Sequence, residues 1–200
     1  MGLQIVTIAS FATLVVAYLW LIDAYAVNTI FVDQWSDLGL IHHAYSGHLT
    51  LSVLWAQHTD NRILFPNLVV LLLAKTTHFN VIDEEFISAF TLMVATALLI
   101  AGHRRRSPRT LWILYLPVAI LMFSLVQNGN TLWGFQFAWY LVLLALSVAL
   151  VLCDDPRWGW LVFAGAIVAA VVGSYSSLQG LLIWPACLVV LCSGAEGCAS

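Results

Sequence analysis

Residues 86–109 read FISAFTLMVATALLIAGHRRRSPR. No charged side chain occurs in residues 86–101, and four arginines follow within residues 104–109. A helix needs about 20 apolar residues to cross the hydrocarbon core of a bilayer, and Lys and Arg accumulate in cytoplasmic loops. We therefore expect a membrane-spanning helix at residues 86–101, with the arginine cluster on the cytoplasmic side.

The whole chain has a similarly apolar composition. Of its 200 residues, 62% are hydrophobic and 8% are charged, and the mean hydropathy is +0.95. A soluble domain carries about 25% charged residues, so we expect membrane lipid to be the main solvent. The net charge of -3, without a second basic cluster, argues against a nucleic-acid partner. The predicted fold class is all-α, a polytopic transmembrane helical bundle.

Two long stretches without Asp, Glu, Lys or Arg follow, one between Arg109 and Asp154 and one between Arg157 and Glu196. Each is long enough for two helices and a tight turn. With an N-terminal helix, the pattern predicts about six spans, at residues 3–30, 86–101, 111–126, 132–152, 158–172 and 181–191. Since no repeat or low-complexity linker is present, residues 1–200 should form a single transmembrane domain.

The first outer loop, residues 32–85, should contain an interfacial helix. Its apolar run at residues 63–74 would measure about 18 Å as a helix, too short to cross unaided, and Pro66 suits a first helical turn. Two alternatives remain. The first helix could be cleaved as a signal peptide after Ala26, or residues 63–74 could be a seventh span, which requires a cleaved or inverted first helix.

Polar and aromatic residues gather in the predicted outer segments and should meet in one pocket. Asp33 and Asp37, four residues apart, would share a helical face. Later outer turns lie at residues 127–136 and 175–179. The candidate site residues are Asp33, Trp35, Asp37, His58, Arg62, Gln127, Asn128, Trp133, Gln136 and Tyr175.

These residue types suit the transfer of a sugar from a phosphate. A carboxylate such as Asp33 can act as general base on a hydroxyl, and the planar fork of Arg62 can hold a phosphate. A Trp ring can stack on a sugar. The same residues have plainer interpretations, because acids favour helix starts and Trp favours membrane interfaces.

We expect neither a metal site nor a disulfide. The histidines of the first outer loop lack ligand spacing, although hard-cation binding at Asp33 stays open, and no cofactor motif is present. The cysteines have neither metal nor framework spacing. They are Cys153, Cys187, Cys192 and Cys198.

Residues 31–106 resemble the GT-C membrane glycosyltransferases, which include the protein mannosyltransferases and the lipid A aminoarabinose transferases. In that class an acidic residue follows the first span, and an interfacial helix leads to a second span with a basic cytoplasmic turn. The corresponding elements here are FVDQW at 31–35, NRILFP at 61–66 and the stretch 86–106. The fragment WAQHTDNRILFP at 55–66 is also similar to uncharacterised bacterial membrane proteins of this kind.

The resemblance implies inverting transfer of a sugar from a polyprenyl-phosphate donor, on the outer face of the bacterial inner (cytoplasmic) membrane, with Asp33 as base. Family members usually have more spans and an outer C-terminal domain. We therefore expect this chain to be the N-terminal part of a longer protein, which could keep the fold without full activity. The alternative is a non-catalytic transporter, flippase or scaffold of a lipid-linked glycan pathway. The absence of charged residues inside the later spans favours surface chemistry over translocation.

Overall fold

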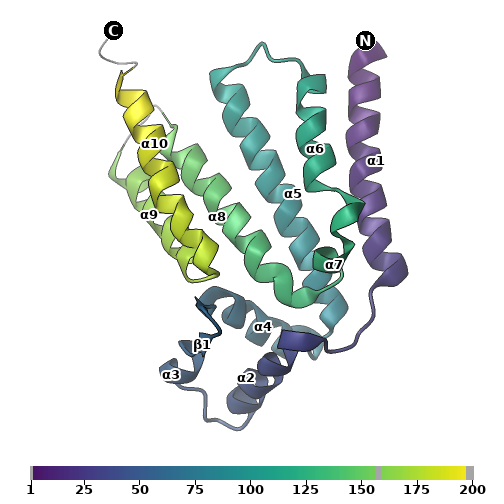
Figure 1. The fold of residues 1–200 in the computed structure, drawn as a ribbon, viewed down its shortest axis with the longest axis vertical. Coiled ribbons are helices and arrows are strands. Elements are labelled where there is room, and N and C mark those ends of the chain that lie inside the picture. Colours follow the sequence, from purple (N-terminus) through teal and green to yellow (C-terminus); the bar gives the residue numbers. More distant parts are fainter. Residues whose placement is uncertain (1, 156–158, 197–200) are drawn as a thin grey trace.

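The computed structural model describes residues 2–155 and 159–196 of the chain (Figure 1). Most of this part is helical and very little of it is strand, which confirms the all-α prediction. Its one sheet is an antiparallel hairpin of two short strands, β1 (Gln57–His58) and β2 (Asn61–Arg62).

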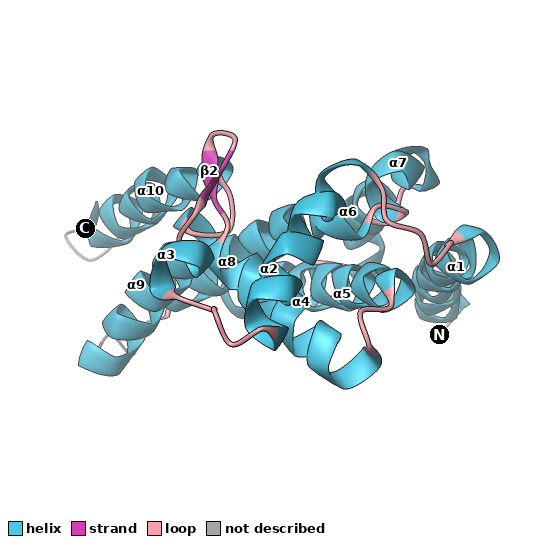
Figure 2. Ribbon diagram, turned by 90° about the horizontal axis from the view of Figure 1, so that it is seen from below, coloured by secondary structure: helices cyan, strands magenta, loops and turns pink. Residues whose placement is uncertain are grey.

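Six of the described helices run side by side and form a bundle (Figure 1). They are α1 (Gly2–Tyr25), α5 (Val81–Arg106), α6 (Leu116–Met122), α8 (Phe137–Cys153), α9 (Trp160–Ser174) and α10 (Ile183–Glu196). A second layer lies across one end of the bundle, as Figure 2 shows from that side. It consists of the hairpin and of α2 (Trp35–Tyr45), α3 (Leu51–Leu54) and α4 (Leu64–Thr77).

Within residues 2–155 and 159–196, four stretches are long and apolar enough to cross a membrane, as an integral membrane protein requires. They are Gly2–Tyr25, Val81–Arg106, Trp112–Thr131 and Gly134–Cys153. The helices α4 and α9 and the stretch Leu178–Ser193 are apolar but shorter. The first part of Leu178–Ser193 is the 3-10 helix η5 (Leu178–Leu182).

The helix predicted at residues 111–126 is interrupted. The stretch Trp112–Thr131 consists of η2 (Trp112–Tyr115), α6, η3 (Leu125–Gln127) and α7 (Asn128–Thr131). Short polar residues and Gly129 follow its apolar part, and these residue types favour turns over a continuous helix. The chain therefore folds back into compact turns before it enters α8.

Local signals explain why α1 ends at Tyr25 while α5 begins before residue 86. Beyond Tyr25 the chain holds β-branched residues and Asn28, which are poorer helix formers than Leu or Ala. The Asn28 side chain accepts a hydrogen bond from the Val81 amide at 3.0 Å, and Asn80 accepts one from the Ile82 amide at 3.2 Å. Both satisfy free N–H groups at the start of α5.

Small residues allow α8, α9 and α10 to pack closely. Ala145 and Ala149 of α8 lie with Ala169 and Ala170 of α9 in one buried cluster, which Ile183 completes. Small side chains let helix backbones approach each other within a membrane. On the other side of α8, a buried hydrogen-bond chain joins Tyr140 to Tyr18 of α1 at 3.1 Å and Tyr18 to Thr131 at 3.0 Å.

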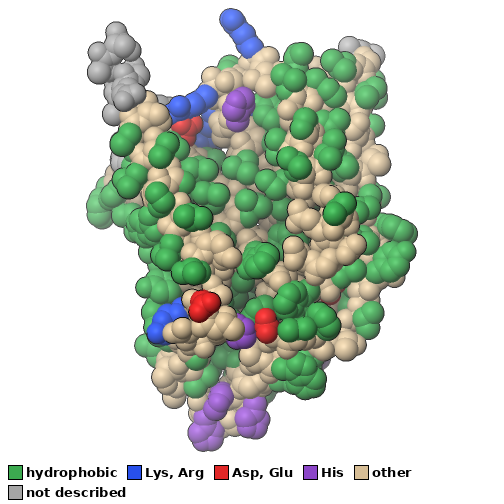
Figure 3. All heavy atoms as spheres, viewed as in Figure 1, with side chains coloured by type: hydrophobic (Ala, Val, Ile, Leu, Met, Phe, Trp, Pro, Cys, Tyr) green, Lys and Arg blue, Asp and Glu red, His purple; other side chains and the backbone are tan. Residues whose placement is uncertain are grey.

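The two ends of the bundle differ in charge. The start of α1, the end of α10 and the turn after α5 lie at one end (Figure 1), and basic side chains gather there, while histidines gather at the opposite end (Figure 3). At the basic end, Arg105 lies 3.7 Å from Asp155 and Arg106 pairs with Asp154. The arginine cluster and the layer formed by α2 to α4 are thus separated by the length of the bundle.

Candidate functional site

A cavity of about 260 Å³ lies where the second layer meets the bundle, and it is here called the outer cavity after the predicted outer loop that lines it. Four separate segments of the chain form its wall. Its lining residues are Asp33, His58, Thr59, Asn61, Ile63, Trp133, Phe135, Gln136, Ala138, Trp139, Ser176 and Ser177. Four of the predicted site residues, Asp33, His58, Trp133 and Gln136, therefore share one cavity.

A carboxylate and an imidazole face each other in this wall. The Oδ2 atom of Asp33 lies 3.9 Å from Nε2 of His58, and the Asp33 side chain is 39% exposed. The distance is too long for a hydrogen bond, and His58 Nε2 is buried without a partner. A substrate hydroxyl that enters between the two groups could bond to both of them.

The backbone before Asp33 is held in an unusual conformation. Val32 has a φ of 47°, in the left-handed region that β-branched residues rarely adopt. The 3-10 helix η1 (Val32–Gln34) begins there, and the amide of Phe31 donates to the Gln34 side chain at 3.2 Å. This turn directs Asp33 to the cavity immediately after the first span.

The hairpin that carries His58 is attached to the turn after α9. The Asn61 side-chain oxygen accepts a hydrogen bond from the Leu178 amide at 2.7 Å and another from Ser177 Oγ at 3.2 Å. The Phe65 amide donates to the Tyr175 carbonyl at 3.3 Å. The first outer loop and the last outer turn thus form a single wall.

An aromatic stack lies beside the outer cavity. The Trp55 and Tyr175 rings are 4.7 Å apart, and the Arg62 guanidinium lies 5.6 Å from the Trp55 ring centre. Arg62 also donates to the Trp55 carbonyl at 2.6 Å. Arg62 and Tyr175 are therefore close to the cavity without lining it.

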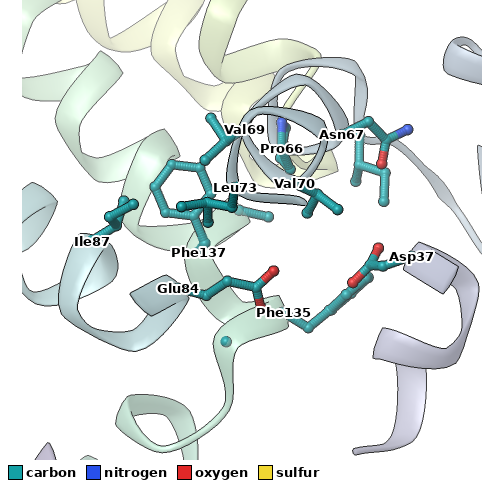
Figure 4. Close-up of a pocket in the computed structure, with 13 residues that line it drawn as sticks. Asp37, Pro66, Asn67, Val69, Val70, Leu73, Glu84, Ile87, Phe135 and Phe137 are labelled. Atoms are coloured by element: carbon teal, nitrogen blue, oxygen red, sulfur yellow. The ribbon is translucent and has the colours of Figure 1, made fainter. Parts of the chain in front are cut away.

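Asp37 lies in a different place from Asp33. Its side chain is 3% exposed and faces Glu84 of α5 across a cavity of about 20 Å³ (Figure 4). The two aspartates belong to separate helices, η1 and α2. The prediction that they share one helical face is therefore wrong. Gln34 donates to Glu84 Oε2 at 2.8 Å, whereas Asp37 Oδ2 and Glu84 Oε1 have no hydrogen-bond partner.

Burial governs the protonation of Asp37. Removal from water, together with the charges of Glu84 and then Asp33, raises the pKa of its carboxyl group to about 8. The cavity has room for about one water molecule. Asp37 therefore stays largely protonated at neutral pH, which suits a structural group better than a base.

The remaining predicted residues lie outside the outer cavity. Trp35 is 65% exposed on α2, and Asn128 is exposed at the start of α7. Gln127 lines a neighbouring cavity of about 200 Å³, which Gln136 and Trp139 also line. The part of the chain that the structure describes contains no group of three or more His, Cys, Asp or Glu able to hold a metal ion. In the same part, Cys153, Cys187 and Cys192 form no disulfide, and Cys198 lies outside it.

No protein-family model, curated protein or solved structure matches the chain. The resemblance to the GT-C enzymes thus stays a prediction from the sequence.

Ser176 and Ser177 line the outer cavity, as the predicted outer turn at residues 175–179 implies. Asn61 and Trp139 also line it but were not expected from the sequence, and each lies within a few residues of a predicted site residue. Their position in the sequence, close to a predicted site residue or outer turn, is the feature that could have identified them. The pairing of Gln34 with Glu84 could not be predicted from the sequence, because it depends on how η1 packs on α5.

Proposed function

We propose that this chain belongs to a membrane glycosyltransferase that moves a sugar from a polyprenyl-phosphate donor to an acceptor on the outer face of the bacterial inner membrane. The observation that carries the proposal is the outer cavity, where the Asp33 and His58 pair lies among Trp rings, a side-chain amide and hydroxyls. Its volume of about 260 Å³ lies below the range of about 300–1,000 Å³ typical of drug-sized ligands, which suits one sugar ring.

The proposal includes six spans and an interfacial helix. The spans are α1, α5, Trp112–Thr131, α8, α9 and η5 with α10, and α4 would lie at the outer interface. An even number of crossings brings the start of α1 and the end of α10 to one side, in agreement with their position at the same end of the bundle (Figure 1). Because that end holds the arginine cluster, it is assigned to the cytoplasm.

In the reaction proposed, Asp33 takes the proton of the acceptor hydroxyl. The acceptor oxygen then forms a bond to the anomeric carbon, on the face opposite the phosphate. The bond from that carbon to the phosphate oxygen breaks, and the polyprenyl phosphate leaves with the electron pair. A single displacement inverts the anomeric configuration.

The aromatic residues serve binding and access. Trp133 offers its ring face to the apolar side of a sugar, and its indole N–H is buried without a partner in the free protein. A bound hydroxyl would satisfy that donor. Trp139 lines the cavity and is 49% exposed, so a polyprenyl chain can approach past it from the lipid.

The position of the ionisable groups supports an enzyme over a transporter. A transporter places such groups near the middle of its spans. In the described helices, Glu84 and Glu85 lie in the first turns of α5, and its basic residues lie in the last turn.

The test is a transferase assay in membranes with a panel of polyprenyl-phosphate sugars. General-base catalysis contributes about 10²–10⁴-fold, so Asp33→Asn should lower turnover by about that factor. Asp60→Asn is the matched control, since Asp60 is exposed at the hairpin turn and lines no part of the cavity. Near-normal turnover in Asp33→Asn would remove Asp33 as the base.

A further inference from the structure

A long apolar groove lies on the other end of the bundle from the outer cavity. Its volume is about 670 Å³, and it runs between α1 and α5. Its lining residues are Phe11, Val15, Met93, Thr96, Ala97, Ile100, Ala101, Arg104, Arg105, Trp112 and Phe123. The Thr96 hydroxyl donates to the Leu92 carbonyl of its own helix at 2.8 Å, so the groove between Met93 and Ala101 is apolar in character.

The length of the groove corresponds to one leaflet of a bilayer. Its α5 lining extends from Met93 to Arg105, which is about 18 Å at the rise of an α-helix. The hydrocarbon core is about 30 Å thick. The groove thus begins at the basic end of the bundle and ends near the middle of the membrane.

A cation with unused hydrogen-bond donors lies at the mouth of the groove. The Arg104 guanidinium lies 4.0 Å from the centre of the Trp112 ring, and its Nη1 donates to the Thr110 carbonyl at 3.0 Å. A guanidinium has five N–H donors, so several remain for a ligand. Among the described residues no carboxylate pairs with Arg104, whereas Arg105 and Arg106 face Asp155 and Asp154.

We propose that this groove binds a membrane phospholipid with an anionic headgroup. Its phosphate contacts Arg104, and one acyl chain lies between α1 and α5. The chain fills apolar space one leaflet deep, and the guanidinium, held in place by Trp112, offers its free donors to the phosphate oxygens. The site is independent of the proposed transferase reaction, because it lies at the opposite end of the bundle.

The test compares two lipids and two arginines. The purified protein in detergent is titrated with phosphatidylglycerol and with phosphatidylcholine of the same acyl chains, and bound lipid is counted by native mass spectrometry. A basic side chain near the headgroups changes the affinity for an anionic lipid about fivefold. We expect phosphatidylglycerol to bind about fivefold more tightly than phosphatidylcholine, with one lipid in the tight site.

Arg104→Gln should remove this preference, because the amide can still donate to Thr110 but carries no charge. Arg106→Gln removes the same charge outside the groove and should leave the affinity within about twofold. Equal binding of the two lipids, or equal losses in the two variants, would show general surface attraction and overturn the site. Binding of polyprenyl phosphate in place of phosphatidylglycerol would overturn the assignment to a phospholipid.

A second pair of variants tests the apolar part of the groove. Ala97→Phe places a ring inside it and should weaken both lipids, whereas Ala12→Phe adds the same ring to an exposed position of α1 outside the lining. Unchanged lipid binding in Ala97→Phe would contradict the position of the acyl chain. This pair also keeps the proposal testable if Arg104→Gln fails to fold.

Discussion

The carboxyl group of Asp37 links stability to pH. Its pKa is about 8 in the folded protein, against 3.8 for the ordinary side chain. Between these values the unfolded chain has lost its proton while the folded protein retains it. Because the unfolded state then binds fewer protons, stability falls as pH rises through this window.

We therefore predict that Asp37→Asn stabilises the protein at pH 8 and changes little at pH 4. The amide keeps the shape of the side chain and removes the cost of ionising it. A gain of about 1–2 kcal/mol corresponds to a rise in the unfolding midpoint of roughly 2–8 °C for a chain of this length. Thermal unfolding in detergent at the two pH values measures it. The exposed Asp60→Asn should shift the midpoint at neither pH, and an equal shift of Asp37→Asn at both would refute the burial argument.

The positions of some site residues could be predicted from the sequence, and those of others could not. Asp33, Trp133 and Gln136 adjoin predicted spans, so their position at one end of the bundle followed from the helix pattern. Asp37 and Arg62 were expected beside them, but their places depend on local backbone geometry. The change from η1 to α2 turns Asp37 inward, and the hairpin aligns Arg62 with Trp55.

At the scale of elements, the contact between α5 and the turn before α8 depends on Gly134. This glycine lies in the 3-10 helix η4 (Gly134–Gln136), against the side chains of Glu84 and Gln34. A Cβ atom there would meet Glu84 Oε2 and would lie 2.9 Å from Gln34 Nε2. The space beside the Gly134 Cα atom therefore fits the hydrogen of glycine but not a Cβ atom.

Gly134→Ala should accordingly lower stability by about 1–3 kcal/mol, the usual cost of forcing extra volume into a packed site. The control is Gly129→Ala, because a Cβ at Gly129 has no neighbour within 4 Å. Alanine there should be neutral or slightly stabilising, since Gly129 lies in the short helix α7. If the two variants unfold at the same temperature, the tight contact at Gly134 is not needed.

The helical elements were predicted well where apolar runs are long and end in clear signals. The helix expected at residues 63–74 corresponds to α4, and the helix expected at residues 86–101 is the centre of α5. The predicted start of α5 was five residues too late, because its polar first turn, with Asp83, Glu84 and Glu85, was assigned to a loop. The interruption of residues 111–126 was missed, since hydropathy alone does not distinguish one long helix from several short ones.

For the whole molecule, the positions of the two ends of the bundle predict a labelling pattern. In a cysteine-free background, single cysteines at Ser46 and Asn128 should react with an impermeant thiol reagent added outside intact cells. A cysteine at Ser107, beside the arginine cluster, should react only after the membrane is permeabilised. Labelling of Ser107 from outside would invert the orientation and would move the outer cavity to the cytoplasm.

The hydrogen bond from the Leu178 amide to Asn61 joins residues 117 positions apart. During synthesis the chain emerges from its N-terminus at about 5–20 residues per second, so the hairpin exists for seconds before its partner is made. Contacts between such distant residues carry a large loop-closure cost and form late. The earlier helices can therefore insert and pack while the wall of the outer cavity is still open. The wall of the outer cavity is therefore completed only after the turn that follows α9 has been translated.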